Sequence, residues 1–533
     1  MTTLPPLPPF SPQDVRQALL ASHENALLDV REEAPFAEGH PLFAANLPAG
    51  RIELDAWRRI PRRDTRIVVY DNGEQLAESA ARRLQELGYT QVHLLTGGLQ
   101  GWKDAGQELF IDVNVPSKSF GELVEAERHT PSIPAEEAQA LIQSGADVVV
   151  LDARRWDEYQ TMSIPQGVSV PGGELVLRAP ALAPHPATHI IVNCAGRTRS
   201  IIGTQSLVNA GLPNRITALR NGTIGWLLAG QTLNHGADQR FPQISAEQQA
   251  QAALRARAVA DRAQVRRATP ADLERFASEA QRTTYRLDVR TPEEYQAGHL
   301  HGFLSYPGGQ LVQETDHAAP VRGARIVLAD DDGTRANMAA SWLAQMGWEV
   351  WVLDNTQGLD WSDTSTPAAY PAAHGPLTEI TPAELAALLN DGGDGSTAVL
   401  DFTASAQYVR RHIPGAWFVL RSSLAQALAR IPKAQRYVLT CGSSLLARYA
   451  VAEVARLTGA PTLLLAGGTQ AWIDAGLPLE TGETRLASPR TDRYRRPYEG
   501  TDAPRSAMQA YLDWEFGLVA QLGRDGTHGF RVL

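Results

Sequence analysis

The 533-residue sequence contains only two cysteines, Cys194 and Cys441, and each directly follows a short apolar run. Runs of this kind, rich in β-branched residues, are typical of buried strands, and a helix-forming segment follows each cysteine. A thiol in a turn between a strand and a helix faces backbone N–H groups, which stabilise an anion and lower the pKa of the thiol. The resulting thiolate can attack an anionic substrate as a nucleophile. We therefore predict that both cysteines are catalytic residues.

The turn after Cys194 has the composition of an anion-binding loop. Arg197 and Arg199 place positive charge within reach of the sulfur. The small Gly196 lets the backbone curl toward it, and Ser200 is placed to cap the following helix. We predict that the substrate is bound by the six residues after the cysteine: Ala195, Gly196, Arg197, Thr198, Arg199 and Ser200.

These turns belong to a repeat. A glycine ends the helix after each of four similar turns. Counting back 17 residues from three of these glycines, and 18 from the fourth, reaches four equivalent positions: Asp71, Cys194, Asp330 and Cys441. Both cysteines of the protein thus occupy the same point of the repeat, and the other two copies have an aspartate there.

Each copy alternates strands and helices over about 110–130 residues. A first apolar run ends in an aspartate, a second precedes the turn, and a third follows the helix. This alternation predicts an α/β domain whose parallel sheet is covered by helices on both faces. In such sheets ligands bind beyond the carboxyl ends of the strands, which is where the turns lie.

The order of these motifs resembles the rhodanese family of sulfurtransferases. Its marks here are the Asp-x-Arg strand end at Asp152 and Arg154, the strand–cysteine–helix loop, and the closing Gly-Gly-x-x-x-Trp of residues 97–102. The resemblance covers nearly all of residues 15–485 and implies an α/β fold of four tandem rhodanese-like domains, each a parallel sheet flanked by helices, plus a C-terminal extension. The predicted boundaries are 1–115 for the non-catalytic repeat 1, 116–240 for repeat 2 with a catalytic cysteine, 241–375 for a linker helix and the non-catalytic repeat 3, 376–485 for repeat 4 with a candidate second catalytic cysteine, and 486–533 for the C-terminal tail.

The resemblance also implies a reaction. The loop cysteine takes a sulfane sulfur from an anionic donor such as thiosulfate, holds it as a persulfide against the loop amides, and passes it to cyanide or a thiol. Family loops often read Cys-x-x-Gly-x-Arg-Ser. Arg199 and Ser200 match this pattern, whereas Gly196 lies one place early and Arg197 takes the usual glycine position. The implied partners are the small-molecule sulfur donor and the thiol or cyanide acceptor, and no cofactor is implied.

The other three copies deviate from the Cys194 loop. An aspartate is a poor sulfur acceptor and repels anionic donors, so copies one and three are predicted to be non-catalytic. For copy three, a metal site in the acidic run 330–332 is the alternative. The Cys441 loop resembles the Cys-Gly-Ser-Gly-Val-Thr loop of mercaptopyruvate sulfurtransferases but carries no loop arginine. A retained core cysteine is the alternative there.

Further residues of copy two accompany the loop. We expect Arg154 to make a structural salt bridge, because Asp-x-Arg recurs in copies one and three. Arg155 and Glu158 are candidates for the pocket. Gly222 and Trp226 belong to the closing turn and are predicted to be packing residues.

Two functions of other classes compete with sulfur transfer. Rhodanese-like folds also host phosphatases, whose loop reads Cys-x5-Arg, but here Ser200 stands at the sixth position and the arginine at the fifth. A loop one residue shorter favours a persulfide over a tetrahedral phosphate. The second alternative is a non-enzymatic sulfur-relay or scaffold protein, which Asp71 and Asp330 favour for half of the chain.

Composition argues against several kinds of partner and site. The formal net charge of −10 disfavours nucleic-acid binding. Two cysteines cannot form a disulfide framework or a cysteine-rich zinc site. The N-terminus shows no signal peptide, and no apolar run of about 18 residues predicts a membrane span. We expect a cytoplasmic protein that binds neither nucleic acid nor membrane and holds no metal. The oligomeric state cannot be derived.

Two segments lie outside the repeat. Residues 244–268 are rich in alanine, glutamine and arginine and predict a connecting helix before copy three. Residues 511–515 predict an amphipathic helix in the tail that packs on a neighbouring repeat. The alternative is that this helix closes over a sulfur site.

Overall fold

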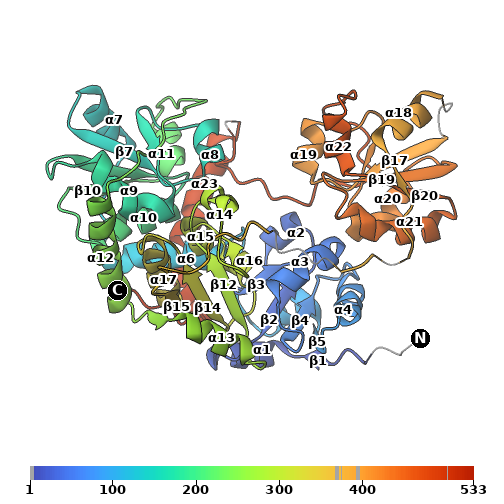
Figure 1. The fold of residues 1–533 in the computed structure, drawn as a ribbon, viewed down its shortest axis with the longest axis horizontal. Helices are drawn as coiled ribbons and strands as arrows, with labels where there is room; N and C mark the ends of the chain where they lie inside the picture. The colour runs from blue at the N-terminus through green and yellow to red at the C-terminus, as the bar shows by residue number, and fades with distance from the viewer. Residues whose placement is uncertain (1–4, 366–370, 374, 392–395, 501) are drawn as a thin grey trace.

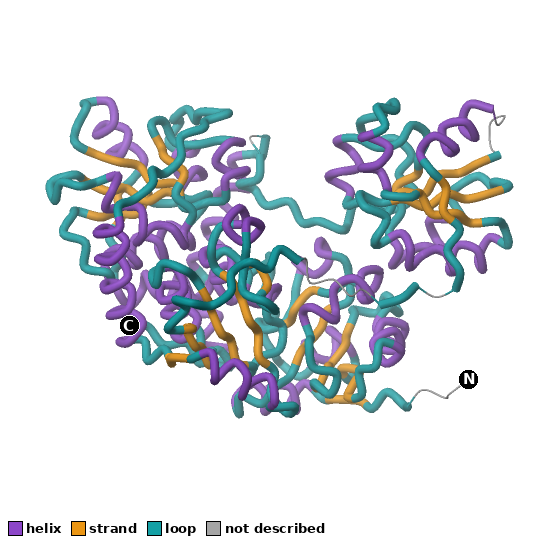
Figure 2. Tube along the Cα trace, in the orientation of Figure 1, coloured by secondary structure: helices purple, strands orange, loops and turns teal. Residues whose placement is uncertain are grey.

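The computed structural model describes residues 5–365, 371–373, 375–391, 396–500 and 502–533. It contains four five-stranded sheets, and in each of them every strand runs parallel to its neighbours. All four sheets have the same strand order, which in the first is β1-β5-β4-β2-β3. The predicted fold class, four tandem α/β units with helix-covered parallel sheets and a C-terminal extension, is confirmed (Figure 1, Figure 2).

Units 1 and 2 are the first two of these repeats. Unit 1 consists of β1 (Pro9–Phe10), α1 (Pro12–Leu20), β2 (Ala26–Asp29), α2 (Glu33–Glu38), β3 (Ala44–Asn46), the 3₁₀ helix η1 (Ala49–Arg51), α3 (Ile52–Arg59), β4 (Arg66–Tyr70), α4 (Ala77–Glu86), β5 (Gln91–Leu95) and α5 (Gly98–Asp104). Unit 2 consists of β6 (Ser132–Ile133), α7 (Ala135–Gln143), β7 (Val148–Asp152), α8 (Trp156–Thr161), β8 (Gly167–Ser169), η2 (Gly172–Glu174), α9 (Leu175–Leu182), β9 (His189–Asn193), α10 (Thr198–Asn209), β10 (Ile216–Leu219) and α11 (Gly222–Leu228).

Units 3 and 4 repeat the plan. Unit 3 consists of β11 (Arg266–Ala268), α13 (Pro270–Ser278), β12 (Thr284–Asp288), α14 (Pro292–Ala297), β13 (Leu304–Ser305), α15 (Gly308–Gln313), α16 (Thr315–Ala318), β14 (Arg325–Ala329), α17 (Arg335–Gln345) and β15 (Glu349–Leu353). Unit 4 consists of β16 (Glu379–Ile380), α18 (Pro382–Asp391), β17 (Thr397–Asp401), α19 (Ser405–Arg410), β18 (Trp417–Phe418), η3 (Arg421–Ser423), α20 (Leu424–Leu428), β19 (Arg436–Thr440), η4 (Ala447–Ala450), α21 (Val451–Thr458), β20 (Thr462–Leu465) and α22 (Gly468–Asp474).

Four further helices lie outside the units. The predicted connecting helix before unit 3 is α12 (Ala246–Arg262), and the predicted tail helix is α23 (Arg505–Phe516), followed by α24 (Leu518–Asp525). The sequence reasoning gave no helix at α6 (Val115–Arg128), which precedes unit 2. Although α6 carries serines, lysine and glutamates, most of its residues from 115 to 124 are buried, because it packs between α10, α24 and α23.

The central strand of each sheet positions the predicted site. β4, β9, β14 and β19 are almost wholly buried, and each is flanked by a parallel strand on both sides. This double burial explains why the strands are continuous apolar runs that can be recognised in the sequence. The next residue in each unit is one of the four equivalent positions: Asp71, Cys194, Asp330 and Cys441. The predicted equivalence of these positions is confirmed.

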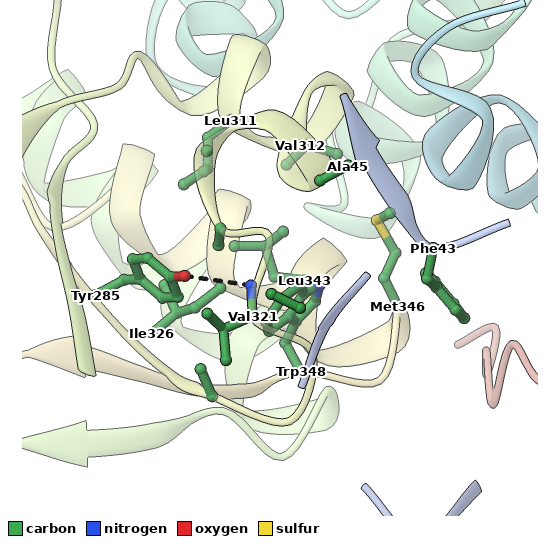
Figure 3. Close-up of a cluster of buried hydrophobic side chains, with 14 of the residues drawn as sticks. Phe43, Ala45, Tyr285, Leu311, Val312, Val321, Ile326, Leu343, Met346 and Trp348 are labelled. Atoms are coloured by element: carbon green, nitrogen blue, oxygen red, sulfur yellow. Dashed lines mark hydrogen bonds between the residues drawn. The ribbon is translucent and has the colours of Figure 1, made fainter. Parts of the chain in front are cut away.

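The units are not independent beads on a chain. One continuous hydrophobic core joins units 1 and 3, α6 and the tail. Figure 3 shows part of it, with Phe43 and Ala45 of unit 1 near Met346 and Trp348 of unit 3. Across the same boundary the hydroxyl of Tyr285 donates to the carbonyl of Arg59, at 2.7 Å.

Two pairs of units meet through short helices. In one, η1 of unit 1 packs on η3 of unit 4, and in the other, η2 of unit 2 packs on α15 of unit 3. A Cβ on Gly173 would lie 2.8 Å from the amide nitrogen of Gly309, so only glycine permits this approach. Unit 2 therefore faces unit 3, and unit 4 faces unit 1.

The Asp-x-Arg motif is structural, as predicted for Arg154. Its guanidinium donates to both carboxylate oxygens of Asp152 and to the carbonyl of Met162, eight residues further on. Arg31 and Arg290 make the same contacts in units 1 and 3. The pair thus ties the end of the second strand of the sheet to the turn after the following helix.

Unit 4 lacks this pair, and its buried Asp401 destabilises the folded state to a degree that depends on pH. Asp401 is fully buried, and its Oδ2 has no hydrogen-bond partner among the described residues. Burial raises the pKa of Asp401 to about 6. Because this value exceeds that of the unfolded chain, the stabilisation is present below about pH 4 and is lost as the pH rises through 6, on the order of 3 kcal/mol.

Restoring the arginine should remove this loss. We expect Thr403→Arg to raise the melting temperature at pH 7.5, where Asp401 is ionised, and to raise it much less at pH 4.5. Thermal unfolding of the full chain at both pH values measures the difference. Gln407→Arg, an exposed position of the same unit, is the matched control for added charge. An equal gain at both pH values would contradict this account of Asp401.

No helix in the described ranges is both long enough and apolar enough to cross a membrane.

Candidate active site

In units 1, 3 and 4 the equivalent turn forms a cradle of backbone amides, and in unit 2 the amide of Ser200 lies near the thiol. In unit 1 the carboxylate of Asp71 accepts from the amides of Gly73 (3.0 Å), Leu76 (2.6 Å) and Ala77 (2.9 Å). These donors lie two, five and six residues after the aspartate. The anionic group that the turn of unit 1 binds is thus the carboxylate of its own Asp71.

Unit 3 fills its cradle in the same way. Asp330 accepts from the amides of Gly333 at 3.1 Å and Ala336 at 2.9 Å. The neighbouring carboxylates of the acidic run, Asp331 and Asp332, pair with Arg335. Among the described residues no group of three or more His, Cys, Asp or Glu side chains could hold a metal ion.

In unit 4 the thiol of Cys441 lies at the backbone amides of the turn. Burial raises the pKa of its thiol, while the backbone amides of Ala447, Leu446 and Ser443 lower it. These amides are again six, five and two residues after the cysteine, as around Asp71. Ser444 turns the loop with a left-handed backbone, φ 62°, at a place where glycine is usual. A persulfide on Cys441 would occupy the place of the Asp71 carboxylate.

Cys194 of unit 2 is enclosed more tightly. Its side chain is 1% exposed, and its thiol donates to the hydroxyl of Ser200 at 3.3 Å. Ser200 in turn donates to the carbonyl of Arg197 at 2.8 Å. Burial raises the pKa of the Cys194 thiol by more than Arg199 and Ser200 lower it, so the expectation of a lowered thiol pKa is wrong for both cysteines.

The sequence predicted that Ser200 caps the following helix, and this prediction is wrong. The helix α10 begins at Thr198, so Ser200 lies within its first turn and holds the sulfur and the loop carbonyl. The predicted loop residues Ala195 and Gly196 lie beside Cys194, where the tail covers them.

Gly222 of the closing turn, which was predicted to be a packing residue, lies directly against the backbone of Cys194. A Cβ on Gly222 would lie 2.3 Å from the carbonyl oxygen of Cys194, and the amide of Thr223 donates to that oxygen at 2.9 Å. Gly468 approaches Cys441 in the same manner. Glycine is required here because the turn backbone lies directly against the residue that carries the sulfur.

Arg199 and Glu158 form a bidentate pair at the mouth of the Cys194 site. The two hydrogen bonds measure 2.7 and 2.8 Å. Burial would raise the pKa of Glu158, but Arg199 lowers it to about 2. Unit 3 repeats the pair as Arg335 and Glu294, although that unit has no thiol. Holding the start of α10 against α8 is therefore one role of this arginine.

Arg197, predicted to bind substrate, is directed elsewhere. Its guanidinium pairs with Glu122 at 2.7 Å and with Glu125, both on α6, and lies 4.2 Å from the ring centroid of Phe516. Arg197 is thus paired with two carboxylates of α6, which leaves it no free charge for the predicted contact with the substrate. The physical reason is the pair of carboxylates on α6, Glu122 and Glu125, which hold the guanidinium.

A cavity of about 190 Å³ adjoins the Cys194 loop. It is lined by Arg155, Glu158 and Arg199 of unit 2, by Gln313 of unit 3 and by Tyr498 of the tail, among others. The two pocket candidates, Arg155 and Glu158, thus lie at this cavity.

Cys441 adjoins a wider crevice. About 420 Å³ lies between units 1, 3 and 4, lined by Leu446 of the cysteine loop and by Arg51 of unit 1. Burial lowers the pKa of Arg51, whereas Asp55 and, more weakly, Cys441 raise it. Arg51 of unit 1 thus lines the same crevice as the unit 4 loop, which has no arginine of its own. No local signal could have shown this, because residue 51 is 390 positions away from the cysteine.

The C-terminal tail supplies further residues that the sequence reasoning missed. Tyr511 and Glu515 of α23 lie against Gly196, and Lys118 of α6 lies below them, paired with Asp112 at 2.8 Å. The amphipathic pattern of residues 511–515 was the only sequence signal for any of these contacts.

Comparisons with known proteins identify the same four units. A family model described as the rhodanese-like domain matches residues 11–105, 134–229, 269–356 and 381–475. The comparison with curated proteins finds no match. A crystal structure of thiosulfate sulfurtransferase from Pseudomonas aeruginosa is 66% identical over 99% of this chain and 100% of that chain, with a TM-score of 0.96. A rhodanese-related protein from Thermoplasma volcanium is 21% identical over 19% of this chain and 97% of that chain, with a TM-score of 0.17.

Proposed function

The chain belongs to the rhodanese family, and on that premise we propose that it is a sulfurtransferase that moves a sulfane sulfur from an anionic donor such as thiosulfate to a thiophilic acceptor. The observation that carries the proposal is the amide cradle, which holds a carboxyl group in units 1 and 3 and a thiol in unit 4, together with the equivalent place of the Cys194 thiol near the Ser200 amide in unit 2. The relative from Pseudomonas aeruginosa, named a thiosulfate sulfurtransferase, supports this choice of donor.

The reaction has two displacements. The thiolate of Cys194 or Cys441 attacks the sulfane sulfur of thiosulfate, an S–S bond forms, the bond to the sulfonate sulfur breaks, and sulfite leaves. The acceptor, cyanide or a thiolate, then attacks the outer sulfur of the persulfide and restores the cysteine thiolate. Backbone amides stabilise the anionic sulfur at each stage without reorganising.

The two cysteine sites bind the donor with different residues. At Cys441 we assign the anion to the amides of Ser443, Leu446 and Ala447, with Arg51 of unit 1 at the crevice. At Cys194 we assign it to the Ser200 amide and hydroxyl and to Arg199, with Thr198, Gly196 and Ala195 shaping the loop. Arg197 holds the loop on α6. Units 1 and 3 are assigned non-catalytic roles.

A reducing compartment such as the cytoplasm suits this chemistry, because both cysteines are free and must stay unoxidised to accept sulfur. A phosphatase is not favoured. The loop has its arginine at the fifth position after Cys194 and a serine at the sixth, and this shorter loop favours a persulfide over a tetrahedral phosphate.

The direct test is the persulfide itself. After brief treatment with thiosulfate and removal of the excess, we expect peptides that contain Cys194 and Cys441 to gain the mass of one sulfur atom. Cyanide should remove the gain and release thiocyanate. The proposal fails if neither peptide gains mass while p-nitrophenyl phosphate is hydrolysed by a route that Cys194→Ser abolishes.

A further inference from the structure

The tail helix α23 is seated on the Cys194 loop. Tyr511, Leu512 and Met508 pack against Ala195 of the loop and Ile224 of α11. Arg505, at the start of the helix, donates to the carbonyls of Leu227 at 2.9 Å and Leu228 at 2.6 Å, which anchors it on the end of α11. The helix therefore covers the turn that carries the thiol.

Glu515 brings a carboxyl group to this turn. Its side chain is 1% exposed, and its Oε1 accepts from the hydroxyl of Tyr511 at 2.9 Å. Its Oε2 has no hydrogen-bond partner in the part of the chain that the structure describes. A Cβ on Gly196 would lie 3.3 Å from that oxygen. The unpartnered oxygen is thus in contact with the loop, two residues after Cys194.

The charges around Glu515 favour its neutral form. Burial and Glu122 of α6 raise its pKa to about 8, while Lys118, Tyr511 and Arg197 lower it. Lys118 is engaged by Asp112, and Arg197 by Glu122. At neutral pH the carboxyl group is therefore mainly protonated, and it is a buried donor without an acceptor.

The Cys194 site needs a donor of this kind. Arg197 is paired with Glu122 and Arg199 with Glu158, so carboxylates already balance most of the positive charge of the loop. An ionised carboxylate beside the loop would repel thiosulfate and the persulfide, whereas a carboxylic acid would attract them by hydrogen bonding.

We propose that Glu515 is a catalytic residue of the Cys194 site, whose protonated carboxyl group donates a hydrogen bond to the anionic sulfur species held there. The species is the thiosulfate anion before transfer and the persulfide after it. This inference rests on the function proposed above, and it adds a residue from outside the four units to the second of them.

The test uses the full chain carrying Cys441→Ser, so that all turnover passes through Cys194. In this parent we expect kcat/KM for thiosulfate to fall as the pH rises through about 8, relative to the variant Glu515→Gln, whose amide stays neutral and can still donate. Glu515→Ala should raise KM for thiosulfate about tenfold at pH 7, because it removes the donor. Cys194 titrates in all variants, so the decisive quantity is the ratio of kcat/KM between variant and parent at each pH.

Asp513→Asn is the matched control, because Asp513 is exposed on the same helix and accepts a hydrogen bond from Gln509. It should follow the parent at every pH. The inference is overturned if Glu515→Gln keeps the parent's pH profile, if Glu515→Ala leaves KM unchanged, or if Asp513→Asn gives the same shift. Failure of the proposed function is a different result, since the parent would then gain no sulfur on Cys194 at any pH.

Discussion

Replacing Cys194 and Cys441 together with serine is expected to lower thiosulfate:cyanide sulfur transfer by at least about a thousandfold. A serine hydroxyl is a far weaker nucleophile than a thiolate at neutral pH and cannot hold a sulfane sulfur. Both cysteines directly follow the central strand of their sheet, and backbone amides of the following turn lie near each thiol. Thiocyanate formation, followed at saturating cyanide, measures the loss.

The single variants divide the activity between the two sites. Each should lose the persulfide on its own peptide and keep it on the other. Asp71→Ser is the matched control, because it places serine at the same point of the non-catalytic unit 1 and should leave turnover unchanged. If the double variant retained more than a tenth of the activity, sulfur transfer would not proceed through these cysteines.

Arg335→Met is expected to destabilise the protein by about 3–5 kcal/mol, because it leaves buried carboxylates without their cation. The Arg335 side chain is 2% exposed and lies between units 2 and 3. Its guanidinium contacts four acidic side chains: Glu174, Glu294, Asp331 and Asp332. Urea unfolding followed by tryptophan fluorescence measures the change.

The comparison is with an exposed arginine of the same unit. The Arg275 side chain is 54% exposed and pairs with Asp272 and Glu279, so Arg275→Met should cost no more than about 1 kcal/mol. Arg335→Lys, which keeps the charge but loses the planar fork, should fall between the two. Equal losses for Arg335→Met and Arg275→Met would contradict the importance of the buried network.

The parts of the fold that could be predicted are those whose signal is local. A central parallel strand is buried on both faces, so residues 189–193 and 325–329 stand out as apolar runs, and each run also marks the turn that follows it. Repetition adds strength, because a weak motif that recurs in a fixed order identifies the same place in each copy. This is how both cysteines were assigned to one point of the repeat.

The parts that could not be predicted depend on contacts between distant segments. The direction of Arg197 is decided by carboxylates on α6, a helix whose buried polar residues gave no amphipathic signal. Arg51 reaches the Cys441 crevice only because unit 4 packs on unit 1. Spacing within one repeat contains no information about which other repeat lies opposite it.

The seat of α23 on the Cys194 loop also orders events during biosynthesis. The ribosome makes the chain from its N-terminus, and domains fold as they emerge, so unit 2 is complete while units 3 and 4 and the tail are still being translated. During that interval nothing covers Ala195 and Gly196, and no carboxyl group stands beside the thiol. The Cys194 site of unit 2 therefore reaches its mature form only after unit 4 has been made and α23 has packed on the Cys194 loop.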